Sequence, residues 1–204
     1  MPVVVVANPK GGVGKSTLST NVAGYFASKG FSVMLGDADR QQSSRLWLGL
    51  RPPQARPIVG WEVGEDKLAK LPKGTTHVVL DTPAGLKGSR MKDVLRHADK
   101  VIVPLQPSIF DIFATRAFLD EIKAHGHPGM QVGIVGMRVD GRTLAADKLR
   151  GFVDGLGLPV LGYLRDTQNY IHLAAHGLTL FDVAPSRVEK DLAQWQGICR
   201  WLDA

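Results

Sequence analysis

The stretch Lys10-Gly11-Gly12-Val13-Gly14-Lys15-Ser16 decides the fold of this chain. It follows an all-apolar run from Val3 to Ala7 and precedes apolar residues at helical spacing, which predicts a buried strand, a glycine turn and a helix N-terminus. Glycines let backbone N–H groups converge on a phosphate without interference from Cβ atoms, and the helix adds the positive end of its dipole. The stretch therefore predicts a phosphate-binding loop in which Lys15 reaches the β- and γ-phosphates and Ser16 ligates Mg²⁺.

Three further motifs follow apolar runs later in the chain. They are Asp37-Ala38-Asp39 with Gln41, Asp81-Thr82-Pro83-Ala84-Gly85 after Val78-Val79-Leu80, and Gln106-Pro107-Ser108 after Val103-Pro104-Leu105. Open parallel α/β sheets bind their ligands at the carboxyl ends of the strands. We therefore expect the carboxylates of Asp37, Asp39 and Asp81 beside the glycine loop.

Taken together, the four motifs resemble those of the ParA/MinD family of ATPases. Residues 9–16 resemble the deviant Walker A loop, in which Lys10 is a second lysine, and Pro9 stands where the ordinary loop has its first glycine. Residues 37–43 resemble switch I, and residues 78–85 resemble the Walker B strand with switch II. The resemblance implies one α/β domain over residues 1–204, a single-domain P-loop NTPase with a mostly parallel twisted sheet and helices on both faces.

The resemblance also implies ATP and Mg²⁺ as cofactors and gives the site residues. Mg²⁺ is held by Ser16, by Asp81 through a water, and by Asp37, which either holds a water of the metal shell or braces the loop. The implied nucleotide contacts come from Gly11, Gly12, Val13, Gly14, Lys15, Ser16, Thr17, Pro107 and Arg138.

Three residues are implied in catalysis: Lys10, Lys15 and Asp39. Asp39 would orient the attacking water, and Lys10 would cross to the nucleotide of a second subunit, so that two ATP molecules are sandwiched in a homodimer. Two other interpretations stay open, since Asp37 and Asp39 are also suited to cap the next helix, and Lys10 to face solvent at a loop tip. Two positions depart from the family pattern: Arg40 replaces a proline, and Met137 replaces an asparagine near the adenine.

Composition indicates a globular protein with an acidic partner. No apolar run approaches the roughly 18 residues of a membrane span, and Met1-Pro2 leads directly into a strand, which leaves no room for a signal peptide. The single cysteine, Cys199, excludes an intramolecular disulfide and the C-x-x-C pair of iron–sulfur scaffold relatives. We therefore expect a cytoplasmic protein, whose formal charge of +6 favours anionic partners.

The excess of positive charge lies before Arg138 and gathers in two clusters. One spans residues 40–56 without an acid, and the other spans residues 87–100. From these clusters we select Arg51, Arg56, Arg90 and Arg96 as candidate contacts to DNA phosphates, with a solvated protein face as the alternative interpretation.

The resemblance implies a ParA-like ATPase that positions intracellular cargo. ATP would close the dimer, the dimer would bind non-specific DNA of the nucleoid, and a ParB-like or cargo adaptor protein would stimulate an otherwise slow hydrolysis. The alternative is a MinD-like, membrane-associated regulator of division or polar placement. The predicted last helix, 186–202, argues against membrane binding, because its polar face balances acidic and basic residues.

Overall fold

The computed structural model describes residues 1–63 and 73–204. Within these residues, seven parallel strands form one sheet in the order β3-β2-β4-β1-β5-β6-β7. The strands are β1 (Val3–Val6), β2 (Val33–Asp37), β3 (Val59–Trp61), β4 (His77–Asp81), β5 (Lys100–Leu105), β6 (Gln131–Gly136) and β7 (Val160–Tyr163). The α/β fold with a parallel sheet is thus confirmed.

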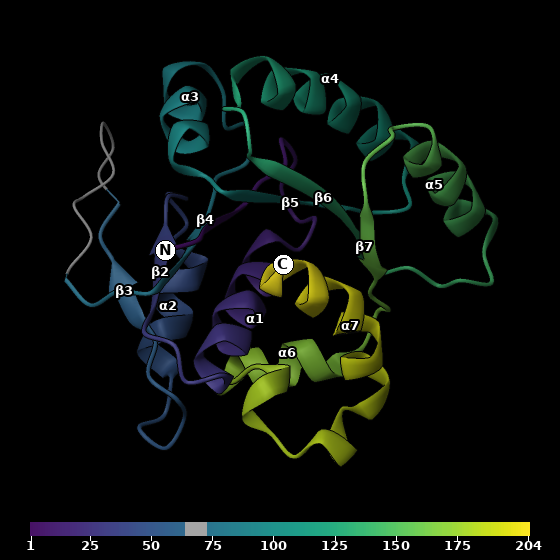
Figure 1. Ribbon diagram of the computed structural model, residues 1–204. Helices are drawn as coiled ribbons and strands as arrows, with labels where there is room; N and C mark the ends of the chain where they lie inside the picture. The colour runs from purple at the N-terminus through teal and green to yellow at the C-terminus, as the bar shows by residue number, and fades with distance from the viewer. Residues whose placement is uncertain (64–72) are drawn as a thin grey trace.

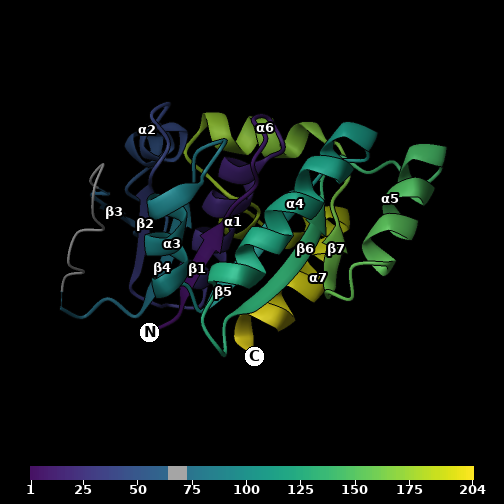
Figure 2. The same cartoon turned by 90° about the horizontal axis from the view of Figure 1, so that it is seen from above.

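Helices cover both faces of the sheet, as Figures 1 and 2 show. Helices α3 (Gly88–His97), α4 (Ile109–His125) and α5 (Leu144–Asp154) pack on one face. The other face carries α1 (Lys15–Ser28), α2 (Ser43–Leu50), α6 (Gln168–Ala175), the short 3₁₀ turns η1 (Leu180–Asp182) and η2 (Pro185–Arg187), and α7 (Glu189–Asp203). Because both faces are covered, the strands are continuous apolar runs rather than alternating ones.

Strand β1 lies at the centre of the sheet and positions the site. It pairs with β4 on one side and β5 on the other, and its four valines are at most 9% exposed. Strands β2 to β4 lie on one side of β1, and strands β5 to β7, which come later in the chain, lie on its other side. The loops that leave β1 and its two neighbours therefore diverge beside β1. Such a switch in strand order opens a crevice at the carboxyl ends of the strands.

The last helix begins later than the pattern predicts, at Glu189 rather than Ser186, because Pro185 to Arg187 form the separate turn η2. Its apolar side packs on the sheet, with Trp195, Ile198 and Leu202 buried. None of the helices in the described part of the chain is long and apolar enough to cross a membrane.

Helix α6 was not expected from the sequence: it has eight residues and only Leu173 is buried, so it leaves little periodic signal. The sequence also predicts a helical turn from Glu65 to Leu71, which lies outside the described residues.

Candidate functional site

The glycine loop runs from β1 into α1 in a conformation that glycine permits. Gly12 has φ 75° and Gly14, which caps α1, has φ 96°, both in the left-handed region. A Cβ atom on Gly14 would lie 2.6 Å from the terminal methyl of Met137, so this side chain packs directly against the loop. The departure at Met137 therefore has a structural role, since its buried side chain supports the turn into α1.

Four hydrogen bonds brace the loop from neighbouring segments. The Lys10 amide donates to Oδ1 of the fully buried Asn8 at 2.8 Å, and Asn8 Nδ2 donates to the Pro104 carbonyl at 2.7 Å. Gln106 Nε2 donates to the Gly12 carbonyl at 3.0 Å, and the Gly85 amide donates to the Pro9 carbonyl at 2.8 Å. The loop is thereby tied to the strand ends of β1 and β5 and to the turn after β4, before any ligand is considered.

The Lys15 ammonium is folded back on its own loop. Lys15 is 7% exposed, and its Nζ donates to the Lys10 carbonyl at 2.7 Å. Burial lowers its pKa, while the charges of Asp81 and Asp39 act in the opposite direction. A phosphate bound at the loop would add negative charge beside this buried cation.

The Asp81 carboxylate at the end of β4 is 1% exposed and only half satisfied. Its Oδ2 accepts a 2.7 Å hydrogen bond from Ser44 Oγ, whereas Oδ1 is buried without a hydrogen-bond partner among the described residues. Burial raises the pKa of the Asp81 carboxyl to about 6, with the hydroxyls of Ser16 and Ser44 acting to lower it. An unpartnered carboxylate oxygen beside a serine hydroxyl is a donor set that fits Mg²⁺, a hard cation that takes oxygen ligands.

The two aspartates at the end of β2 and just after it, Asp37 and Asp39, accept hydrogen bonds from backbone amides. Asp37 Oδ1 accepts from the Asp39 amide at 2.9 Å, and Oδ2 accepts from the amides of Ser44 and Arg45 at 2.8 and 3.1 Å. Asp37 thus holds the first turn of α2. Asp39 Oδ1 accepts from the Gln41 amide at 3.0 Å, and Asp39 lines the cavity described next, where it could orient a water.

The loop, switch I and switch II enclose an open cavity of about 770 Å³. Of the residues selected from the sequence, it brings together Gly11, Gly12, Gly14, Lys15, Ser16, Thr17, Asp39, Arg90 and Arg138. Val13 is buried and Pro107 does not line the cavity, so contacts from these two side chains receive no support from the geometry. Arg40 and Lys87 also line it, which makes the rim strongly basic.

Arg90, selected as a DNA contact, connects helix α3 to switch I. Its Nη2 donates to the carbonyl of Ala38 at 3.0 Å, which joins α3 to switch I at the edge of the cavity. We therefore assign Arg90 to the cavity and remove it from the candidate DNA surface.

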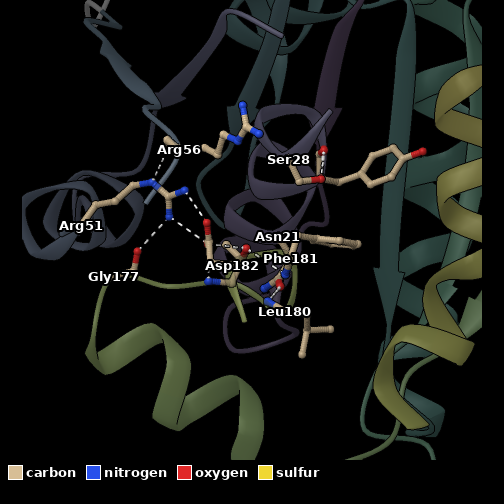
Figure 3. Close-up of polar contacts among 10 residues, drawn as sticks. Asn21, Ser28, Arg51, Arg56, Gly177, Leu180, Phe181 and Asp182 are labelled. Carbon is tan, nitrogen blue, oxygen red and sulfur yellow. Dashed lines mark hydrogen bonds and ion pairs between the residues drawn. The ribbon is translucent and has the colours of Figure 1, made fainter. Parts of the chain in front are cut away.

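Arg51, also selected as a DNA contact, is held in a buried ion pair with Asp182 of η1 (Figure 3). Both side chains are 5% exposed, and the guanidinium donates twice to Asp182, at 2.8 and 3.0 Å, and once each to the carbonyls of Gly177 and Arg56. The guanidinium also lies 5.3 Å from the centre of the Trp47 ring. Arg51 is not available to a DNA phosphate, because all its polar partners are internal.

The other two candidate DNA residues are exposed. Arg96 on α3 pairs with Asp93 at 2.6 Å and keeps 71% of its side chain accessible, and Lys92, one turn before it, is exposed as well. Arg56 is exposed near the β3 edge of the sheet. Lys100, the last cation of the basic cluster at residues 87–100, is instead buried and donates to carbonyls at the end of α7.

The family model for the CobQ/CobB/MinD/ParA nucleotide-binding domain matches residues 4–180. The chain belongs to this family. The resemblance to the ParA/MinD ATPases is thereby confirmed.

Individual relatives of this ParA/MinD family member cover most of its length. Maintenance of carboxysome distribution protein A of Halothiobacillus neapolitanus is 26% identical, over 88% of this chain and 87% of the relative. The chromosome-partitioning ATPase Soj of Thermus thermophilus is 29% identical, over 72% of this chain and 73% of the relative. A putative plasmid partition protein of Borrelia burgdorferi, solved with AMPPNP, superposes with a TM-score of 0.75 at 17% identity, covering 98% of this chain and 99% of that one. This last likeness establishes the shared fold.

Sequence reasoning did not select three residues that shape the site: Asn8, Ser44 and Gln106. Each acts through a hydrogen bond to a residue far along the chain or to a backbone carbonyl, and such bonds have no sequence pattern. Gln106 could have been selected from the sequence, because it lies in the motif that follows β5.

Proposed function

We propose that this chain is an ATP hydrolase that acts as a nucleotide-dependent switch and positions intracellular cargo. The observation that carries the proposal is the buried Asp81 carboxyl, whose Oδ1 has no hydrogen-bond partner among the described residues and which lies beside Ser16, a residue of the cavity lining. A buried carboxylate oxygen without a hydrogen bond is costly unless a ligand completes it. Mg²⁺ bound with a nucleotide would complete it, directly or through a water, and membership of an ATPase family agrees with this reading.

Within this proposal, each polar group of the site has a task. Lys15 leaves the Lys10 carbonyl and binds the β- and γ-phosphates, and the N–H groups of residues 11–17 surround the same oxygens. Ser16 and Asp81 would hold a magnesium ion, which would neutralise charge on the phosphates. Asp39 orients the attacking water, and Asp37 keeps the start of α2 in place.

The second lysine of the loop, Lys10, supplies the link to a partner subunit. We propose that Lys10 binds the nucleotide of a second copy, so that ATP closes a homodimer and hydrolysis lets it part. Hydrolysis would be slow until a ParB-like or cargo adaptor protein stimulates it. The names of two relatives, which speak of carboxysome distribution and chromosome partitioning, agree with cargo positioning but differ in the cargo.

We propose that the protein binds DNA, which would place it in the cytoplasm on the nucleoid. The exposed cations Lys92 and Arg96 on α3, one turn apart, are the candidate phosphate contacts, together with Arg56. Contacts to phosphates make binding independent of sequence and steeply dependent on salt.

A fluorescence anisotropy titration on an arbitrary duplex tests the proposal, with ATP, with ADP and without nucleotide, at two salt concentrations. We expect binding with ATP only, and a fall in affinity of tenfold or more between about 50 and 200 mM salt. Absence of DNA binding under every nucleotide condition would contradict the DNA part, and absence of ATP hydrolysis under all conditions would contradict the enzymatic part.

Paired variants locate the surface. The double variant Lys92→Ala with Arg96→Ala should weaken DNA binding at least several-fold without changing nucleotide affinity. Its matched control is Arg142→Ala with Lys148→Ala, which removes the same charge from exposed positions at and near α5. Equal loss in both double variants would mean that net charge, rather than the α3 surface, binds the DNA.

A further inference from the structure

Ser44 joins the two carboxylates at the ends of β2 and β4. Asp37 and Asp81 are register partners in these adjacent parallel strands. The Ser44 amide donates to Asp37 Oδ2 at 2.8 Å, while its Oγ donates to Asp81 Oδ2 at 2.7 Å. One residue in the first turn of α2 therefore contacts both acidic groups behind the nucleotide cavity.

Ser44 differs from a ligand in that its hydroxyl already donates to Asp81, and neither of these two residues lines the cavity. Ser44 is fully buried, whereas its neighbour Ser43 lines the cavity. Its hydroxyl is thus committed to Asp81 and lies out of contact with a nucleotide. Ser44 therefore acts on the site through the Asp81 carboxylate to which it donates a hydrogen bond.

We propose that Ser44 is a positioning residue that fixes the Asp81 carboxylate for magnesium and couples the occupied metal site to helix α2. The inference rests on the proposed nucleotide and magnesium binding. The terminal torsion of an aspartate is broad, so a carboxylate without a fixed partner can turn. The bond from Ser44 to Oδ2 removes that freedom and leaves Oδ1 as the oxygen presented to the metal or to a water bound to it.

The same bond makes α2 part of the metal site. The helix is held at its start by Asp37 and Asp81 and just beyond its end by the ion pair of Arg51 with Asp182. Because linkage is reciprocal, a metal ion that fixes Asp81 must also stabilise the first turn of α2. Groups that orient a metal ligand from the outer shell typically change metal affinity by 10–100-fold when they are removed.

The first experiment measures how tightly the full chain binds a fluorescent ATP analogue, in EDTA and across a Mg²⁺ titration. For Ser44→Ala we expect the affinity in EDTA to stay at the wild-type value, and the Mg²⁺ concentration for half-maximal tightening to rise about tenfold. Ser44→Thr, which keeps a hydroxyl, should recover at least part of this loss. Ser19→Ala is the matched control, because Ser19 is an equally buried helical serine whose Oγ has no hydrogen-bond partner among the described residues.

A second readout follows hydrogen exchange in the first turn of α2. Mg²⁺ with nucleotide should slow exchange there in the wild type and in Ser19→Ala, and should do so much less in Ser44→Ala. This measurement on the wild type alone tests the coupling if Ser44→Ala does not fold, since unchanged exchange on adding Mg²⁺ and nucleotide would overturn it.

The outcomes separate the inference from the function on which it rests. A wild type that binds no nucleotide, or whose binding Mg²⁺ does not tighten, contradicts the proposed function and with it this role of Ser44. A wild type that responds to Mg²⁺ while Ser44→Ala responds identically overturns the inference alone. An equal loss of affinity with and without Mg²⁺ would also overturn it, because it would show that Ser44 merely supports the fold.

Discussion

Replacing Arg51 by alanine is expected to destabilise the protein by about 3–5 kcal/mol, because it leaves the Asp182 carboxylate buried without its cation. Both side chains are 5% exposed, so water cannot take the place of the guanidinium. Asp182 keeps its hydrogen bonds from the amide and hydroxyl of Thr179, at 2.8 and 2.7 Å, which favours the lower end of the range. For a chain of this size the loss corresponds to a melting temperature lower by about 6–20 °C.

Urea denaturation followed by circular dichroism measures the loss. Arg142→Ala is the control, because its ion pair with Asp140 is 90% and 50% exposed and such surface pairs contribute at most about 1 kcal/mol. The double variant Arg51→Met with Asp182→Leu should regain part of the stability, since it removes both buried charges but also removes the acceptor for the amide and hydroxyl of Thr179. If Arg51→Ala costs no more than Arg142→Ala, the assignment of Arg51 to a stabilising buried pair is wrong.

Three further predictions concern stability. Burial raises the pKa of Asp81 to about 6, so without Mg²⁺ the folded state retains a proton that the unfolded chain releases near pH 4, and stability falls as the pH rises between these values. Asp81→Asn should remove this pH dependence and raise the free energy of unfolding by roughly 1–3 kcal/mol above pH 6. Urea denaturation in EDTA at pH 5 and 7.5 measures both effects. In the same assay, Gly177→Ala should lower the free energy of unfolding by at least about 1 kcal/mol more than Gly157→Ala. Both glycines have positive φ, but a Cβ atom on Gly177 would lie 2.4 Å from the Arg51 backbone, whereas a Cβ atom on Gly157 would face open space. Lys100→Met should cost about 1–3 kcal/mol and speed hydrogen exchange in the last turn of α7, whose carbonyls Lys100 Nζ binds.

The elements next to the nucleotide were predictable because local chemistry determines them. Apolar runs gave the central strands, and glycines with positive φ mark the loop between β1 and α1. The three acidic residues were expected at strand ends, where the structure places Asp37 and Asp81 as register partners.

What sequence could not predict are the partners of individual polar side chains. Arg51 belongs to a run of four arginines that suggests a basic surface, yet its partner Asp182 lies 131 residues later in the chain. The same applies to Ser44, whose partner Asp81 is 37 residues away. Pairs of this kind depend on how the helices and strands pack together, and no local sequence pattern indicates which distant residues that packing brings into contact.

The stacking of Arg51 on Trp47 also gives the protein an intrinsic optical probe. Trp47 is 5% exposed on α2, and the guanidinium lies 5.3 Å from the centre of its ring. Indole emission responds to a nearby cation and to solvent, so a displacement of the Arg51 side chain from the Trp47 ring would alter the intensity or wavelength of this fluorescence. Events at the nucleotide site could then be followed in real time on the unlabelled chain.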